Sequence, residues 1–177
     1  QRRRPHFSKV LAAGQMNQAI RAHIESKVYE AYQALVPPIE VMFDNVQETP
    51  PALPYVICLI SYLDVTTPVI CQGESMVEQI NGNLQLSVYA PRGRGMGALE
   101  LYAQAGIKAM ATMYDATGDA KVKCGAANGP TALLSGDQPY AVATVSCSFV
   151  ARYDDSSSSG GTTRLQTSDV LLTHPTL

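Results

Sequence analysis

Two strand-like runs follow each other in this chain without a helix between them: residues 55–64, YVICLISYLD, and residues 76–90, MVEQINGNLQLSVYA. In the second run Leu84, Leu86 and Val88 alternate with more polar residues, which is the period of a strand with one buried face. Successive strands without an intervening helix favour antiparallel pairing. The first run is almost continuously apolar, and this composition predicts burial on both of its faces.

Helical patterns lie on both sides of these two runs. Apolar residues at three- and four-residue steps predict a helix that begins at an N-cap, Asn17, and ends before Pro37. The same spacing predicts a second, alanine-rich helix that begins near Ala98 and ends at Gly118. Inside the second strand-like run, Asn81-Gly82-Asn83 indicates a hairpin turn or a bulge.

The order of elements defines the expected fold class. Three more strands are predicted at residues 39–44, 121–124 and 140–153, so the order is one helix, three extended segments, a second helix and two extended segments. This order predicts an α+β fold, with a mixed, mostly antiparallel sheet, two helices packed on one face, and extended N- and C-terminal arms.

The chain divides by composition into a basic N-terminal arm at residues 1–14, a folded domain at residues 15–155, and a Ser/Gly linker with a C-terminal arm at residues 156–177. The formal net charge of the 177 residues is −2, and the first nine residues carry four cations and no acid, so the remainder carries −2 − 4 = −6. An acidic body is a poor nucleic-acid binder, because affinity for DNA comes largely from cations that displace phosphate counterions.

The sequence disfavours two further classes of protein: membrane proteins and secreted proteins with a signal peptide. The longest apolar run is six residues, at 55–60, whereas a membrane span needs about 20, so we expect no membrane contact. The basic start has no apolar stretch behind it, so no secretory signal is expected.

One glycine-rich loop, Gly93 to Gly97, lies between a predicted strand and a predicted helix, where a phosphate-binding loop would lie. Its spacing is G-x-G-x-G, and it has neither the GK[ST] ending of a Walker loop nor the G-x-G-x-x-G of a dinucleotide site. A nucleotide-binding enzyme that uses this loop remains an alternative of another class. The favoured interpretation is a flexible entry to the helix.

No other pattern indicates catalysis. The histidines are scattered, and the cysteines form no C-x-x-C pair, so we expect no catalytic residue, no metal site and no cofactor, and we expect reduced, packed cysteines in a cytoplasmic setting. These residues are His6, His23, His174, Cys58, Cys71, Cys124 and Cys147.

About three quarters of the chain resembles the tail terminator proteins of long-tailed bacteriophages, the lambda-type minor tail family. The similar features begin with an amphipathic helix over residues 20–35, a short strand over 39–43 and a proline-led apolar strand over 54–63. A long strand that ends in LSVYAP at 86–91 follows, and then the entry loop Gly93 to Gly97 into an alanine-rich helix. A closing strand over 140–153 completes the resemblance.

The resemblance implies a structural virion protein without enzymatic activity. Such proteins form a hexameric ring on the tail tube, stop further addition of tube subunits, and offer their other face to a head-side connector or neck protein. DNA passes through the ring with transient, non-specific contact, and assembly takes place in the host bacterial cytoplasm. The arms of this chain are longer than a minimal terminator needs, which leaves open a related role as a head–tail connector or adaptor of the neck.

Two sets of residues are the candidates for such a role. Subunit or partner contacts are expected from arginines, which interfaces favour, and from apolar groups in the arms that cannot form a core alone: Arg92, Arg94, Arg2, Arg3, Arg4, Phe7, Val170, Leu171 and Leu172. An acidic lumen that lets DNA slide is expected from four carboxylates: Glu74, Glu78, Asp115 and Asp119.

Overall fold

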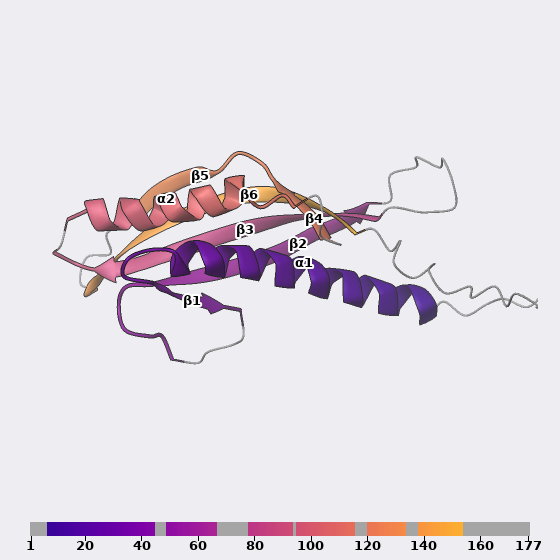
Figure 1. Cartoon of the computed structure of the whole chain (residues 1–177), viewed down its shortest axis with the longest axis horizontal. Helices are drawn as coiled ribbons and strands as arrows, with labels where there is room; N and C mark the ends of the chain where they lie inside the picture. The colour runs from indigo at the N-terminus through magenta and orange to yellow at the C-terminus, as the bar shows by residue number, and fades with distance from the viewer. Residues whose placement is uncertain are drawn as a thin grey trace, which may run out of the picture.

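The computed structural model of the chain describes residues 7–44, 49–66, 78–93, 95–115, 120–133 and 138–153. These residues form two helices and one six-stranded sheet (Figure 1). The elements are α1 (Phe7–Gln33), β1 (Glu40–Phe43), β2 (Tyr55–Thr66), β3 (Glu78–Pro91), α2 (Gly97–Ala111), β4 (Ala120–Cys124), β5 (Asn128–Leu133) and β6 (Tyr140–Tyr153). The predicted α+β class is confirmed.

The sheet is mixed and mostly antiparallel, as predicted. Its strand order is β1-β2-β3-β6-β4, and β5 pairs with β6 as well. Only the β1–β2 pair is parallel among the described strands. β3 and β6 pair along their whole length, from Glu78 opposite Tyr153 to Pro91 opposite Tyr140. These two long strands therefore form the spine on which the other elements are placed.

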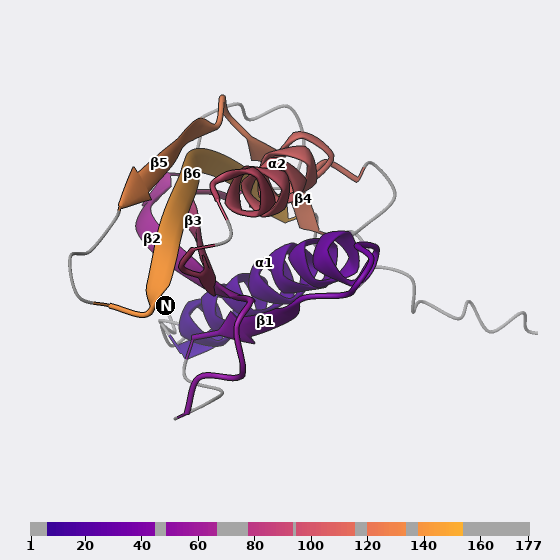
Figure 2. The ribbon, with the colours of Figure 1, turned by 90° about the vertical axis from the view of Figure 1, so that its left-hand side faces the viewer.

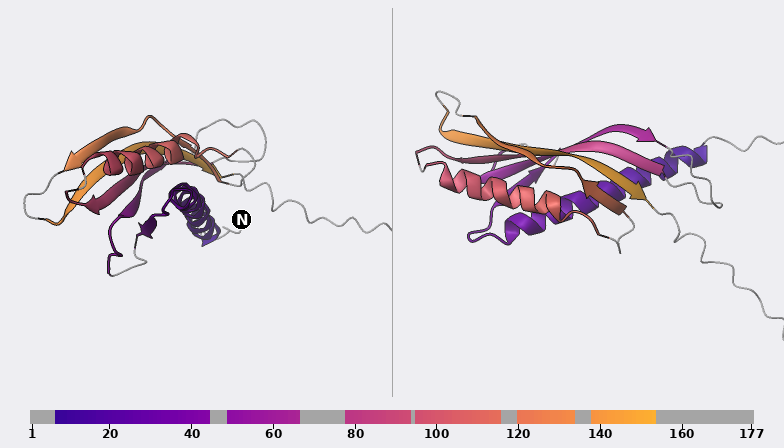
Figure 3. Two further views of the ribbon diagram at one scale, coloured as in Figure 1. Left: turned by 60° about the vertical axis from the view of Figure 1, so that its left-hand side comes forward. Right: turned by 90° about the horizontal axis from the view of Figure 1, so that it is seen from above.

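Both helices pack on the same face of the sheet (Figures 2 and 3). The helical stripe predicted for α1 is confirmed, because Ile20, Ile24 and Val28 have no exposed surface. Alternate residues of the central strands face the helices, and among them Leu86 of β3 and Val145 of β6 are fully buried. The core is therefore one layer between the sheet and the two helices.

The predicted turn or bulge at Asn81-Gly82-Asn83 is wrong for β3, which runs through these residues without interruption. The register shift lies in the opposite strand, between Tyr62 and Asp64 of β2. Gly82 has another role. The ring of Phe149 lies directly over it, and a Cβ atom there would also come within 2.6 Å of the Ser61 carbonyl oxygen. The glycine therefore makes room for the phenyl ring.

Two helix boundaries and one strand differ most from the sequence-based expectations. α1 begins at Phe7 instead of Asn17, so residues 7–14, which were predicted to be an arm, are helical. α2 ends at Ala111, before the predicted Gly118. β5 was predicted to be part of a loop, and it is a strand that contains glycine and proline and has exposed side chains at residues 128–132. Burial periodicity cannot detect a strand without a buried face.

Candidate interaction surface

The face of the sheet opposite the helices carries no helix among the described residues (Figure 3). On β2 this leaves aliphatic side chains in solvent, with Leu59 38% and Leu63 65% exposed. The expectation that this run is buried on both faces is therefore wrong for the isolated chain. Its continuous apolar composition has a different cause, because every second residue packs under the helices while the others form an open apolar surface.

Three tyrosines from adjacent strands form the end of this open face. Tyr55 of β2 stacks on Tyr89 of β3, with ring centroids 4.8 Å apart and planes at 11°. Tyr89 in turn meets Tyr140 of β6 edge to face, with centroids 5.4 Å apart. Burial, and then the two neighbouring phenols, raise the pKa of Tyr55. Tyr55 is only 7% exposed and the other two tyrosines are half-buried. Tyr89 and Tyr140 therefore supply the accessible part of the cluster, with amphipathic rings of the kind that protein interfaces favour.

The middle of the open face is polar and uncharged. The Gln85 amide donates to Ser87 Oγ at 3.4 Å, and Ser87 Oγ lies 3.4 Å from Thr144 Oγ1. Cations gather near the far end of the face, where the Arg152 guanidinium donates to Gln79 Oε1 at 3.4 Å. Lys121 and Lys123 of β4, opposite Arg152 and Val150 of β6, lie on the same side of the sheet. Because interface centres are depleted in charge, the uncharged middle of the face is suited to contact with another protein.

A second candidate surface lies between the two helices. It is a groove of about 550 Å³, and small alanine side chains on both helices leave this space open. Leu101 of α2 forms part of its wall and is 59% exposed. The described residues that line it are Lys27, Glu30, Ala31, Ala34, Leu35, Leu101, Gln104, Ala105, Lys108, Ala109 and Thr112.

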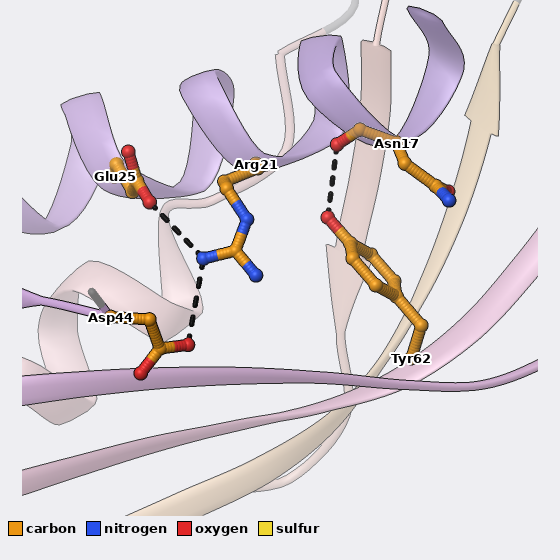
Figure 4. Close-up of polar contacts among 5 residues, drawn as sticks. All are labelled: Asn17, Arg21, Glu25, Asp44 and Tyr62. Carbon is orange, nitrogen blue, oxygen red and sulfur yellow. Dashed lines mark hydrogen bonds and ion pairs between the residues drawn. The ribbon is translucent and has the colours of Figure 1, made fainter. Parts of the chain in front are cut away.

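A polar cluster fixes α1 to the edge of the sheet (Figure 4). Arg21 Nη1 lies 3.4 Å from Glu25 Oε1 and 3.5 Å from Asp44 Oδ2, and its guanidinium carbon lies 6.0 Å from the centre of the Tyr62 ring. The Tyr62 hydroxyl donates to the carbonyl oxygen of Asn17 at 2.9 Å. Such half-exposed ion pairs contribute about 1 kcal/mol or less each, so the cluster orients elements and is not a reaction centre.

Four of the thirteen residues predicted for contact and for the lumen belong to the described part of the chain, and they lie on different elements. Arg92 is exposed just after β3, where its backbone N–H donates to the Pro139 carbonyl oxygen at 3.0 Å. Phe7 begins α1, Glu78 begins β3, and Asp115 follows α2. The other predicted residues lie outside the described ones: Arg2, Arg3, Arg4, Arg94, Glu74, Asp119, Val170, Leu171 and Leu172.

The glycine-rich loop, His23 and two of the cysteines lie in surroundings that give them structural roles. Gly93 and Gly95 have φ of 89° and 79°, the left-handed region that a turn into α2 uses and that glycine adopts without strain. His23 Nε2 lies 2.8 Å from the Met113 carbonyl oxygen. Cys58 and Cys147 are free and buried. In the described part of the chain, no three His, Cys, Asp or Glu side chains lie close enough to hold a metal ion.

Comparisons with known proteins define the fold and no more. No protein-family model matches the chain, and no curated protein matches it. A solved structure that bears no functional name is similar with a TM-score of 0.56 and 22% sequence identity, over 78% of this chain and 96% of the other. In the ranges that the structure describes, no helix is long and apolar enough to cross a membrane. The chain thus contains an α+β domain with one helix-covered and one open sheet face.

Proposed function

We propose that this protein is a structural component of a tailed bacteriophage: a tail terminator whose copies form a ring, most simply a hexamer, that caps the tail tube. The ring stops tube polymerisation and provides the surface for attachment of the head or neck. The observation that carries the proposal is the open sheet face, where exposed aliphatic residues of β2 adjoin the tyrosine cluster of Tyr55, Tyr89 and Tyr140.

A ring needs two different complementary surfaces on each subunit, because head-to-tail contacts close by rotation. The open face supplies the exposed aliphatic residues of β2 beside an uncharged polar middle, and this combination favours protein contact. Arg92 at the end of β3, together with Arg94, is the proposed polar contact beside it, since a guanidinium pairs well with a carboxylate of a neighbouring copy. A scaffold of this kind performs no reaction and needs no cofactor.

The charge of the chain supports passage of DNA through such a ring. The chain without its first nine residues carries a net charge of −6, so a lumen that it forms repels phosphates and holds DNA in no fixed position. Glu78 and Asp115, with Glu74 and Asp119, are the proposed acidic groups of the lumen. The tail tube protein and a head-side connector are the proposed partners, and the virion tail is the proposed location.

A neck connector or adaptor is the second candidate, and the long Ser/Gly-linked segment at residues 156–177 favours it. The two candidates differ in the particles that form when the protein is missing. Without a terminator, tubes grow past their regulated length. Without an adaptor, tails of regulated length accumulate beside unjoined heads.

Deletion of the gene from the phage therefore tests the proposal. Electron microscopy of the lysate should show tubes of uncontrolled length, and supply of the wild-type chain from a plasmid should restore uniform tails. Supply of the Leu59→Lys variant, which places a charge on the open face, should fail to restore them. Uniform tails of normal length in the deletion mutant would reject the terminator role.

A further inference from the structure

The groove between α1 and α2 has the volume of a ligand pocket and a lining of both apolar and charged residues. Its volume of about 550 Å³ lies within the range of about 300–1,000 Å³ that ligand pockets occupy. Ala31 and Ala105 line it from the two helices, and Leu101 presents an aliphatic wall that is 59% exposed. An aliphatic ligand would remove this apolar surface from water, which is favourable.

The charged groups that line the groove select an anionic ligand. Lys27 of α1 and Lys108 of α2 line it from opposite sides, and neither ammonium group has an ion-pair partner among the described residues. Glu30 is the third charged residue there, and it already accepts a hydrogen bond from Ser26 at 3.2 Å. The ligand that fits best is therefore an extended peptide with one carboxylate next to aliphatic side chains.

The chain carries a segment of this chemistry, Asp169-Val170-Leu171-Leu172. It belongs to residues 154–177, which follow the end of β6 at Tyr153 and lie outside the described structure. The spacing from Tyr153 to Asp169 is 169 − 153 = 16 residues, and such a connection reaches about 50 Å when extended. A domain of this size has a radius of gyration of about 14 Å, so the groove is within reach.

We propose that the α1–α2 groove binds residues 169–172 of the same chain, with the Asp169 carboxylate next to Lys27 and Lys108 and the aliphatic side chains over Leu101 and the alanines. A tethered segment has an effective concentration in the millimolar range, so it occupies the groove ahead of segments from other molecules at lower concentration. This inference does not depend on the proposed phage function.

The absence of tryptophan from the chain gives a direct test. In the full chain, Leu171→Trp places the only tryptophan in the docking segment, and Thr163→Trp places it outside that segment; excitation at the red edge of the absorption band avoids the nine tyrosines. The account predicts emission at shorter wavelength and several-fold weaker acrylamide quenching for Leu171→Trp than for Thr163→Trp. Equal emission and equal quenching of the two proteins would overturn the proposal.

Second substitutions in the Leu171→Trp protein identify the groove as the binding site. Leu101→Glu and Lys108→Glu should each shift the emission towards that of the solvent-exposed control, whereas Glu100→Gln, next to the groove on α2 but not part of its lining, should not. Asp169→Lys combined with Lys108→Glu should restore the buried signal through the reversed charge pair. Unchanged emission in both groove variants, with their thermal unfolding intact, would overturn the proposal.

Dilution distinguishes the tethered segment from one supplied by another molecule. Emission of the Leu171→Trp protein should stay constant on dilution, since docking within one chain does not depend on concentration. A shift to longer wavelength on dilution would mean that the segment lies in the groove of a second copy, and it would contradict docking within one chain.

Discussion

Gly106 of α2 lies directly against Tyr32 of α1: a Cβ atom at residue 106 would come within 2.7 Å of the Tyr32 hydroxyl oxygen. That hydroxyl donates to the Tyr102 carbonyl oxygen, one turn earlier in α2, at 3.1 Å. The same Cβ atom would lie 2.9 Å from Leu86 Cδ1 of β3. The missing side chain at residue 106 therefore sets how closely α2 approaches both α1 and the sheet, and the groove is open beside this contact.

The substitution Gly106→Ala should destabilise the fold. The added methyl group overpacks a buried contact, which costs about 1–3 kcal/mol, more than the roughly 1 kcal/mol that alanine gains over glycine in a helix. Urea unfolding measures the change. Gly97→Ala is the matched control in the same helix, because nothing lies within 4 Å of its Cβ position, and it should leave stability unchanged or raise it. Equal stability of the two variants would contradict the close packing at Gly106.

Gly82→Ala should be more harmful than the same substitution at Gly106. Its Cβ atom would press on the Phe149 ring and on the Ser61 carbonyl oxygen, and a backbone atom in the middle of a sheet cannot move aside. We expect a loss of at least about 2–3 kcal/mol in the free energy of unfolding. Asn83→Ala changes the next residue of the same strand, which is exposed, and serves as the control. A Gly82→Ala protein as stable as this control would show that the ring does not lie over the strand.

Stability should fall at alkaline pH, in part because of Cys58. Burial is the main cause that raises the pKa of this thiol to about 12, and the nearby carboxylates of Glu25 and Asp44 raise it further. An unfolded thiol titrates near about 8.5, so the unfolded state loses its proton first as the pH rises. The stabilisation is complete below about pH 8.5 and is lost between about pH 9 and 12, by up to about 1.4 kcal/mol per pH unit.

Urea unfolding of the wild type and of Cys58→Ala at about pH 8, 9 and 10 isolates this contribution. The wild type should lose more stability over this interval than the variant, although the variant starts lower because of lost packing. Tyr32 is present in both proteins, and because burial is the main cause of its raised pKa, with Cys58 the smaller cause, most of its contribution cancels. Parallel pH dependences would show that Cys58 is not held as a buried thiol.

Periodicity in the sequence predicted the elements that have one buried and one exposed face. β6 was predicted at residues 140–153 and spans Tyr140–Tyr153, because its alternation continues along the whole strand. The start of α1 was missed because residues 7–14 show no sustained periodicity. β5 was missed because its side chains at residues 128–132 are exposed, so the strand that pairs with β6 leaves no apolar pattern.

The candidate surfaces were harder to predict, because they depend on the register of the sheet and on helix packing. Tyr55, Tyr89 and Tyr140 are far apart in the sequence and meet only through the pairing of β2, β3 and β6. An apolar run such as residues 55–64 has the same composition whether its second face is covered or open. The alanine-rich composition of α2 can be read from the sequence, but the groove exists because α1 contributes small residues at the same place.

The mass of the native assembly tests the central claim most directly. Native mass spectrometry of the full chain, free and after incubation with tail tubes, should show one closed ring of fixed stoichiometry, with a hexamer expected. Leu59→Lys on the open face should reduce it to monomers, whereas Leu101→Lys, on the helix-covered side of the fold, should leave the ring intact. A chain that stays monomeric both alone and on tubes, or a ring that Leu59→Lys leaves unchanged, would contradict the account.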